Sequence, residues 1–164
     1  MTHQQASAKT PGWPWYQPWA ALATFSALLN FLWEMVVMPA YEARSTSAAG
    51  VGIAMCLLAT LGDVGITLGS YAVAASITTR RWLCRQTVAS FATYLAVGLV
   101  LTIAFEYVNV YVLHRWSYAP RMQVVAGFGV LPLLQWLVLP PIVLWLARRH
   151  GASALIVNPP RTIM

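Results

Sequence analysis

Three of the chain's four acidic residues, Glu34, Asp63 and Glu106, lie in stretches that are apolar enough to cross a bilayer. On insertion scales a charged side chain at mid-membrane costs roughly 2.5–3.5 kcal/mol, so three cost on the order of 8 kcal/mol unless they are protonated, paired or hydrated. A Gln would hold helices together without that cost. We therefore expect the acids to bind protons or cations, or to act as general acids and bases, with Asp63 and Glu106 as the catalytic candidates.

Several polar side chains fall on the same helical faces as the acids, three, four or seven residues away. Aromatic faces in the same region could stabilise a cationic species. Besides the three acids, the candidate ligand-binding residues are Asn30, Thr60, Thr67, Thr102, Asn109, Trp116, Tyr118 and Gln135.

The depths of the three acids in their spans predict a funnel-shaped site. Glu34 and Glu106 lie about two turns or less from the outer ends of their spans, whereas Asp63 is close to the middle of its own. The site then opens towards the outer side, although Glu34 could instead reach outward to water. In a dry site we expect protonated carboxyls that are hydrogen-bonded to Asn, Thr and Gln, and in a wet site an anionic vestibule that attracts cations.

Four apolar segments, each long enough for the roughly 20 residues of a spanning helix, must position these side chains. They are residues 19–38, 50–75, 88–112 and 124–147. Only 9% of the residues are charged, against about a quarter in an average soluble domain. We predict an all-α polytopic membrane protein with four transmembrane helices over residues 19–147. Residues 1–18 form an interfacial N-terminal segment, and residues 148–164 form a cytoplasmic C-terminal tail.

The distribution of basic residues predicts the orientation. Seven of the ten Lys and Arg residues lie before the first span, between the second and third, or after the fourth, and three lie in the other two loops. Under the positive-inside rule both termini are cytoplasmic. Topology and contacts with membrane lipids thus account for the formal charge of +6 without nucleic acid. We expect no signal-peptide cleavage, because the first apolar run is of full spanning length.

No cofactor is expected from the sequence. The three His residues, His3, His114 and His150, lie at or beyond the span ends, which disfavours haem, and no Glu-x-x-His pair indicates a zinc or di-iron site. Cys56 and Cys84 are expected near opposite leaflets, where they cannot form a disulfide. A hard cation such as Ca²⁺ or Mg²⁺, held by the carboxylates, stays open.

Small residues and prolines predict how the helices pack. Gly62, Gly65 and Gly69 share a face of the second span and allow close helix contact, within the bundle or in a homo-oligomer. The fourth span holds three prolines, which predict kinks or unwound turns whose free carbonyl groups need other partners.

Short motifs spread over most of the chain resemble those of uncharacterised small bacterial four-helix membrane proteins. The motifs are Trp33-Glu34, Leu61-Gly62-Asp63-Val64, Glu106 with Asn109, Trp116 with Tyr118 and Pro120, and Leu133-Leu134-Gln135-Trp136. This resemblance implies the inner membrane of a bacterium and brings no activity with it.

A second resemblance covers residues 106–132. An acid, a Trp-x-Tyr sequence and a Gly-rich helix start with Leu-Pro are similar to membrane carotenoid cyclases of the heterodimeric lycopene cyclase type. Those cyclases carry paired glutamates after the Pro, where this chain has Leu133 and Leu134 followed by Gln135. The resemblance implies an isoprenoid or other lipid ligand.

Three functions stay open on the sequence alone. The first is proton- or cation-linked transport or binding of a small cationic or amphiphilic ligand at the carboxylate site, by a homo-oligomer. The second is an intramembrane acid–base enzyme of the isomerase, cyclase or hydratase type, which requires an apolar cavity with a carboxyl at its blind end. The third is a subunit or assembly factor of a larger membrane complex.

Overall fold

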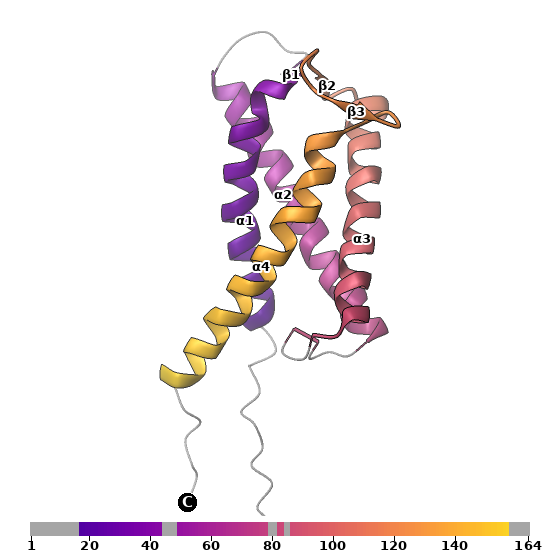
Figure 1. The fold of residues 1–164 in the computed structure, drawn as a ribbon. Helices are drawn as coiled ribbons and strands as arrows, with labels where there is room; N and C mark the ends of the chain where they lie inside the picture. Colours follow the sequence, from indigo (N-terminus) through magenta and orange to yellow (C-terminus); the bar gives the residue numbers. More distant parts are fainter. Residues whose placement is uncertain (1–16, 44–48, 79–81, 84–85, 158–164) are drawn as a thin grey trace, which may run out of the picture.

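Four long helices form the frame of the molecule (Figure 1). The structure is a computed structural model that describes residues 17–43, 49–78, 82–83 and 86–157. The helices are α1 (Gln17–Val37), α2 (Ala49–Ile77), α3 (Val88–Tyr107) and α4 (Val130–Val157). Each contains a stretch long and apolar enough to span a membrane, so the predicted all-α architecture with four transmembrane helices is confirmed.

Parts of the predicted terminal segments cannot be compared with the structure. Residues 1–16 of the interfacial segment and residues 158–164 of the tail lie outside the described residues. The fourth helix continues past residue 147, where the transmembrane domain is predicted to end, as far as Val157.

The helices pack as a closed ring in which α1 contacts α2 and α4, and α3 contacts the same two helices. In Figure 1, α1 begins and α4 ends at the same end of the bundle, as an even number of spans requires. The short strands gather at the opposite end, which we call the strand end.

A two-stranded sheet connects distant parts of the chain at the strand end. After α1, a 3-10 turn (Met38–Ala40) leads into β1 (Tyr41–Ala43), which pairs antiparallel with β2 (Trp116–Tyr118). Tyr41 lies opposite Tyr118 in this register. The backbone N–H of Ala119 also donates to the carbonyl of Ala40, at 3.0 Å. The segment after α1 is therefore fixed to the segment after α3.

The fourth helix begins at Val130 and not at residue 124 as predicted. The residues before it form a hairpin of β3 (Val124–Val125) and β4 (Phe128–Gly129). Its two central residues, Ala126 and Gly127, both have positive φ, 52° and 88°. This combination is the type I′ turn, whose twist matches that of paired strands. Hydropathy extends the span into the hairpin because both its strands are apolar.

The prolines of α4 do not unwind it. The helix is continuous through Pro140 and Pro141, and the described part of α4 contains no unwound turn. Because a proline has no N–H, Pro140 leaves the carbonyl of Trp136 without its usual intrahelical donor. A small cavity of about 10 Å³, large enough for a single water molecule, lies beside Trp136 and Pro140.

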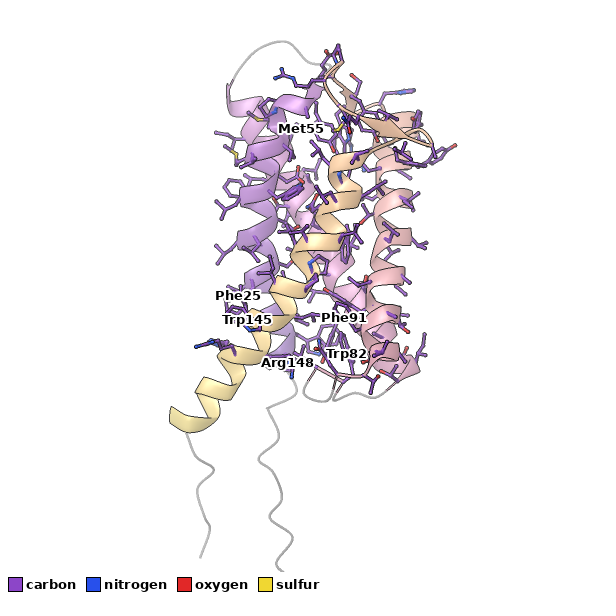
Figure 2. The ribbon with its side chains drawn as sticks, in the orientation of Figure 1. Phe25, Met55, Trp82, Phe91, Trp145 and Arg148 are labelled. Atoms are coloured by element: carbon purple, nitrogen blue, oxygen red, sulfur yellow. The ribbon has the colours of Figure 1, made fainter. Side chains whose placement is uncertain are left out.

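An aromatic cluster fills the end of the bundle opposite the strand end. Tyr71, Trp82, Tyr94 and Trp136 follow one another with ring centroids 5.4, 5.5 and 6.2 Å apart, and Trp19 joins at Tyr71. Trp82 lies in the connection between α2 and α3 and is fully buried. In Figure 2, Trp82 and Met55 lie at opposite ends of the molecule. The aromatic cluster therefore closes one end of the ring of helices.

The exposed surface is apolar, and many polar side chains are buried. Leu32, Leu61 and Leu137 are between 61% and 69% exposed, as lipid-facing residues of a membrane bundle are. The buried polar residues are Ser26, Asn30, Thr60, Asp63, Thr67, Ser70, Ser90, Thr102, Glu106, Asn109 and Gln135. The interior of the bundle therefore contains a polar region beside its apolar core.

Candidate functional site: an acidic cavity within the bundle

A cavity of about 100 Å³ lies between the four helices, towards the strand end. A buried water needs about 10–15 Å³ of such volume, so the cavity has room for several waters or for a small organic ion. Figure 2 labels one of its residues, Met55. The lining residues are Glu34, Met38, Tyr41, Gly52, Met55, Cys56, Ala59, Asp63, Ile66, Thr102, Phe105, Glu106, Trp116, Pro132 and Gln135.

The cavity brings together the three acids from three different helices. Asp63 on α2 and Glu106 on α3 are 7% and 6% exposed, and Glu34 on α1 is half-buried. Glu34 is near enough to interact electrostatically with both other acids, so its side chain faces the cavity and not the outer surface. None of the described residues that line the cavity is Lys, Arg or His. Among the residues that the structure describes, the carboxyls thus have no fixed positive charge in the lining beside them.

A chain of hydrogen bonds holds Asp63 in place. Both amide hydrogens of Gln135 are used, one for Asp63 Oδ2 at 2.9 Å and one for Asn30 Oδ1 at 2.8 Å. Asn30 in turn donates to the carbonyl and the hydroxyl oxygen of Ser26, each at 2.9 Å. The Ser26 hydroxyl shares a 2.9 Å hydrogen bond with Thr67. Residues of α1, α2 and α4 therefore fix one carboxyl oxygen of Asp63.

The second acid is held from the sheet at the strand end. The Tyr118 hydroxyl donates to Glu106 Oε2 at 2.8 Å. Burial, and next the Glu106 carboxylate, raise the pKa of the Tyr118 phenol above its ordinary value. The same two causes raise the pKa of the Tyr41 phenol. Both tyrosines therefore stay protonated at physiological pH, and Tyr118 remains a hydrogen-bond donor.

Other predicted site residues have partners elsewhere. Thr60 donates to the carbonyl of Cys56 at 2.7 Å and does not line the cavity. Asn109 lies on the π-helical turn Val108–Val112, where it donates to the carbonyl of Phe105 and accepts from Arg115. Its amide therefore fixes the chain after α3 and is not presented to the three acids.

The remaining predicted residues divide between the two cavities. Thr102 and Trp116 line the acidic cavity, whereas Asn30 and Thr67 line the small cavity beside Pro140. Gln135 lines both, so it lies between the two spaces. The small cavity is therefore adjacent to the acidic one, on the side of Trp136 in the aromatic cluster.

Two residues of the site are not among the site residues predicted from the sequence. Ser26 precedes Asn30 by four residues on the same helical face, a spacing that could have identified it. Tyr41 enters the cavity through the pairing of β1 with β2, which the spacing along the chain does not reveal.

One buried polar atom at the cavity is unpaired. Thr102 is only 4% exposed, yet its Oγ1 has no hydrogen-bond partner among the described residues. Buried polar side chains are nearly always paired with protein or with ordered water. The cavity therefore provides an unused hydroxyl to whatever occupies it.

The carboxyls do not form a compact metal site. Within the described part of the chain, no group of three or more His, Cys, Asp or Glu residues is placed to hold a metal ion.

Comparisons with protein-family models, with curated proteins and with solved structures found no match. The function of the cavity is therefore inferred from its own residues.

Replacing Gln135 by Leu should destabilise the bundle by about 1–3 kcal/mol, because it leaves buried oxygens of Asn30 and Asp63 without donors. Unfolding of the purified protein in detergent measures the change. Thr60→Val is the matched control, since Thr60 donates only to a carbonyl within its own helix. It should cost about 0.6 kcal/mol or less. Equal losses in the two variants would show that the Gln135 hydrogen bonds do not hold the site.

Proposed function

We propose that this protein binds a small cation in the acidic cavity in exchange for protons, and that it serves proton-linked transport or binding of a small cationic or amphiphilic ligand. The observation that carries the proposal is the meeting of Glu34, Asp63 and Glu106 at one cavity, where the lining residues that the structure describes include no basic side chain. In an apolar bundle such acids are expensive, and intramembrane carboxylates of this kind mark ion pathways and proton relays.

Charge balance explains why protons and cations would compete there. Three carboxylates in a small, water-poor space repel one another, so the site needs bound protons or a bound cation to remain stable. A cation that enters supplies the balancing charge, and a proton can then leave. The two ligands are linked because each occupies the site at the expense of the other.

The fixed hydrogen bonds support a site that is ready for such a ligand. Gln135 holds one oxygen of Asp63, and Tyr118 holds one oxygen of Glu106. Both residues line the cavity, where their carboxyls can meet a ligand. A carboxyl held in position needs less ordering when the ligand binds, which favours affinity.

The proposed orientation places the strand end outside and both termini in the cytoplasm of a bacterial inner membrane. The excess of basic residues on the terminal side supports it. In this orientation the cavity lies in the outer half of the membrane. The ligand would then arrive from the periplasmic side.

Exchange can be measured with proteoliposomes that contain a pH-sensitive dye and an acidic interior. Adding Na⁺, K⁺, Ca²⁺ or tetramethylammonium outside should, for at least one of the four cations, raise the internal pH faster than in protein-free liposomes. Protons leave only as fast as cations enter, so the response should saturate with cation concentration. If all four cations gave the response of empty liposomes, exchange across the membrane would be contradicted.

The same geometry supports a second candidate function, intramembrane acid–base catalysis on an isoprenoid or lipid. Asp63 presents a carboxyl to a cavity that also contains the rings of Phe105 and Trp116. A carboxylic acid can protonate an alkene, and aromatic faces stabilise the cation that results. This function requires a bound lipid substrate, which native mass spectrometry of the purified protein would detect.

A further inference from the structure

Three aromatic rings surround the cavity that contains the acids. They are Tyr41 of β1, Phe105 of α3 and Trp116 of β2. The Trp116 ring centroid is 6.4 Å from that of Tyr41, with the ring planes at 83°, and 6.3 Å from that of Phe105, with the planes at 46°. Aromatic rings that line one space at an angle to one another are typical of the cages that hold quaternary ammonium ions.

The carboxyl groups are poorly placed for a hard metal ion. Ca²⁺ and Mg²⁺ take about six or more oxygen ligands at roughly 2.0–2.6 Å. Over the residues that the structure describes, no three acidic side chains come together at metal-binding distances. Carboxyls that are spread around a cavity suit a larger ion, whose charge is distributed over several atoms.

The unpaired Thr102 hydroxyl is an independent indication that the cavity takes a ligand. Thr102 Oγ1 is buried, belongs to the lining and has no partner in the described part of the molecule. A hydroxyl in this state is completed by a ligand or by water that enters with it. The thioethers of Met38 and Met55 add a polarizable, adaptable surface to the same lining.

From these observations we propose that the cation is a small alkylammonium ion, held by the carboxyls through its charge and by the three rings through its alkyl groups. This inference rests on the proposed function, since it names the class of cation that exchanges with protons. Trp116 is the central contact because it neighbours both other rings. Loss of its indole should therefore weaken binding of an organic cation more than binding of a metal ion.

Equilibrium dialysis of radiolabelled tetramethylammonium against the purified full-length protein in detergent tests this inference. The wild type should bind tetramethylammonium about tenfold or more tightly than Na⁺, K⁺ or Ca²⁺, which are tested as competitors. Trp116→Leu should lower tetramethylammonium affinity about tenfold, and Trp116→Phe, which keeps a ring, should lower it less. Trp145→Leu is the control because Trp145 is 56% exposed and lies outside the cavity. It should bind as the wild type does.

The outcomes separate the two proposals. If Na⁺, K⁺ or Ca²⁺ displaces tetramethylammonium at equal concentration, or if Trp116→Leu binds as well as Trp145→Leu, the alkylammonium assignment is wrong and cation–proton exchange stands. If no cation binds at all, both proposals fail. Should Trp116→Leu not yield folded protein, Phe105→Leu replaces it in the same comparison. If Phe105→Leu bound tetramethylammonium as tightly as the wild type does, the proposed contribution of the aromatic rings to binding would also be wrong.

Discussion

Replacing Asp63 by Asn or Glu106 by Gln is expected to weaken cation binding by about tenfold or more in each case, equivalent to about 1.4 kcal/mol. Each change removes one negative charge from a cavity of low water content, where charges interact more strongly than in bulk water. Each amide keeps the shape of the acid and an oxygen to accept the hydrogen bond from Gln135 or Tyr118. The thermal stability of both variants should therefore be unchanged or higher, because a buried ionisable group is lost.

Glu42→Gln is the matched control for these two variants. Glu42 lies on β1, is exposed and does not line the cavity, so its neutralisation changes the charge near the same end of the molecule without touching the site. We expect its affinity for cations to differ from that of the wild type by about twofold or less. Titration calorimetry on all four proteins gives the comparison. If both cavity variants bound cations with wild-type affinity, the two carboxyls would not be part of the binding site.

Replacing Gly98 by Ala should destabilise the bundle by about 1–3 kcal/mol, the usual cost of overpacking. Gly98 is a buried residue of α3, and a Cβ there would collide with the Trp136 ring of α4. Trp136 cannot easily move aside, because it is 4% exposed and packs against Tyr94 with ring centroids 6.2 Å apart. The contact between α3 and α4 thus depends on the absence of a side chain at this position. Reversible unfolding in detergent measures the loss.

The control for this variant is Gly65→Ala on α2. A Cβ at Gly65 meets nothing within 4 Å, and the residue is exposed. Because Ala is a better helix former than Gly, this substitution should leave stability unchanged or raise it by up to about 1 kcal/mol. A loss at Gly65 equal to that at Gly98 would mean that glycine serves backbone flexibility at both positions and not helix contact.

The elements of the bundle could be predicted from the sequence because hydropathy and helix-ending residues act locally. Pro39 lies in the 3-10 turn that follows α1, and Thr87 caps α3 through reciprocal hydrogen bonds with Ser90. The shared positions of Glu34, Asp63 and Glu106 also follow from local rules, since an acid in a spanning helix is cheapest on the inner face. Gln135 is among the predicted site residues, but its hydrogen bond to Asp63 is known only from the structure.

The rest of the site depends on contacts between distant segments. Tyr41 and Tyr118 lie opposite each other across the β1–β2 pair, and no local spacing indicates that pairing. Asn109 has the helical spacing of a site residue, but the wider π-helical turn directs its amide to Arg115. The predicted start of α4 was wrong because hydropathy alone does not distinguish an apolar hairpin from the end of a helix.

Proton release on cation binding tests the exchange of protons for a cation most directly. The purified protein in weakly buffered detergent solution at about pH 7 is mixed with the cation that it binds most tightly, and the released protons are counted with a pH indicator. Linkage between the two ligands predicts that about one proton leaves for each cation bound, and that Glu106→Gln releases fewer. Saturable cation binding with no proton release would contradict the account.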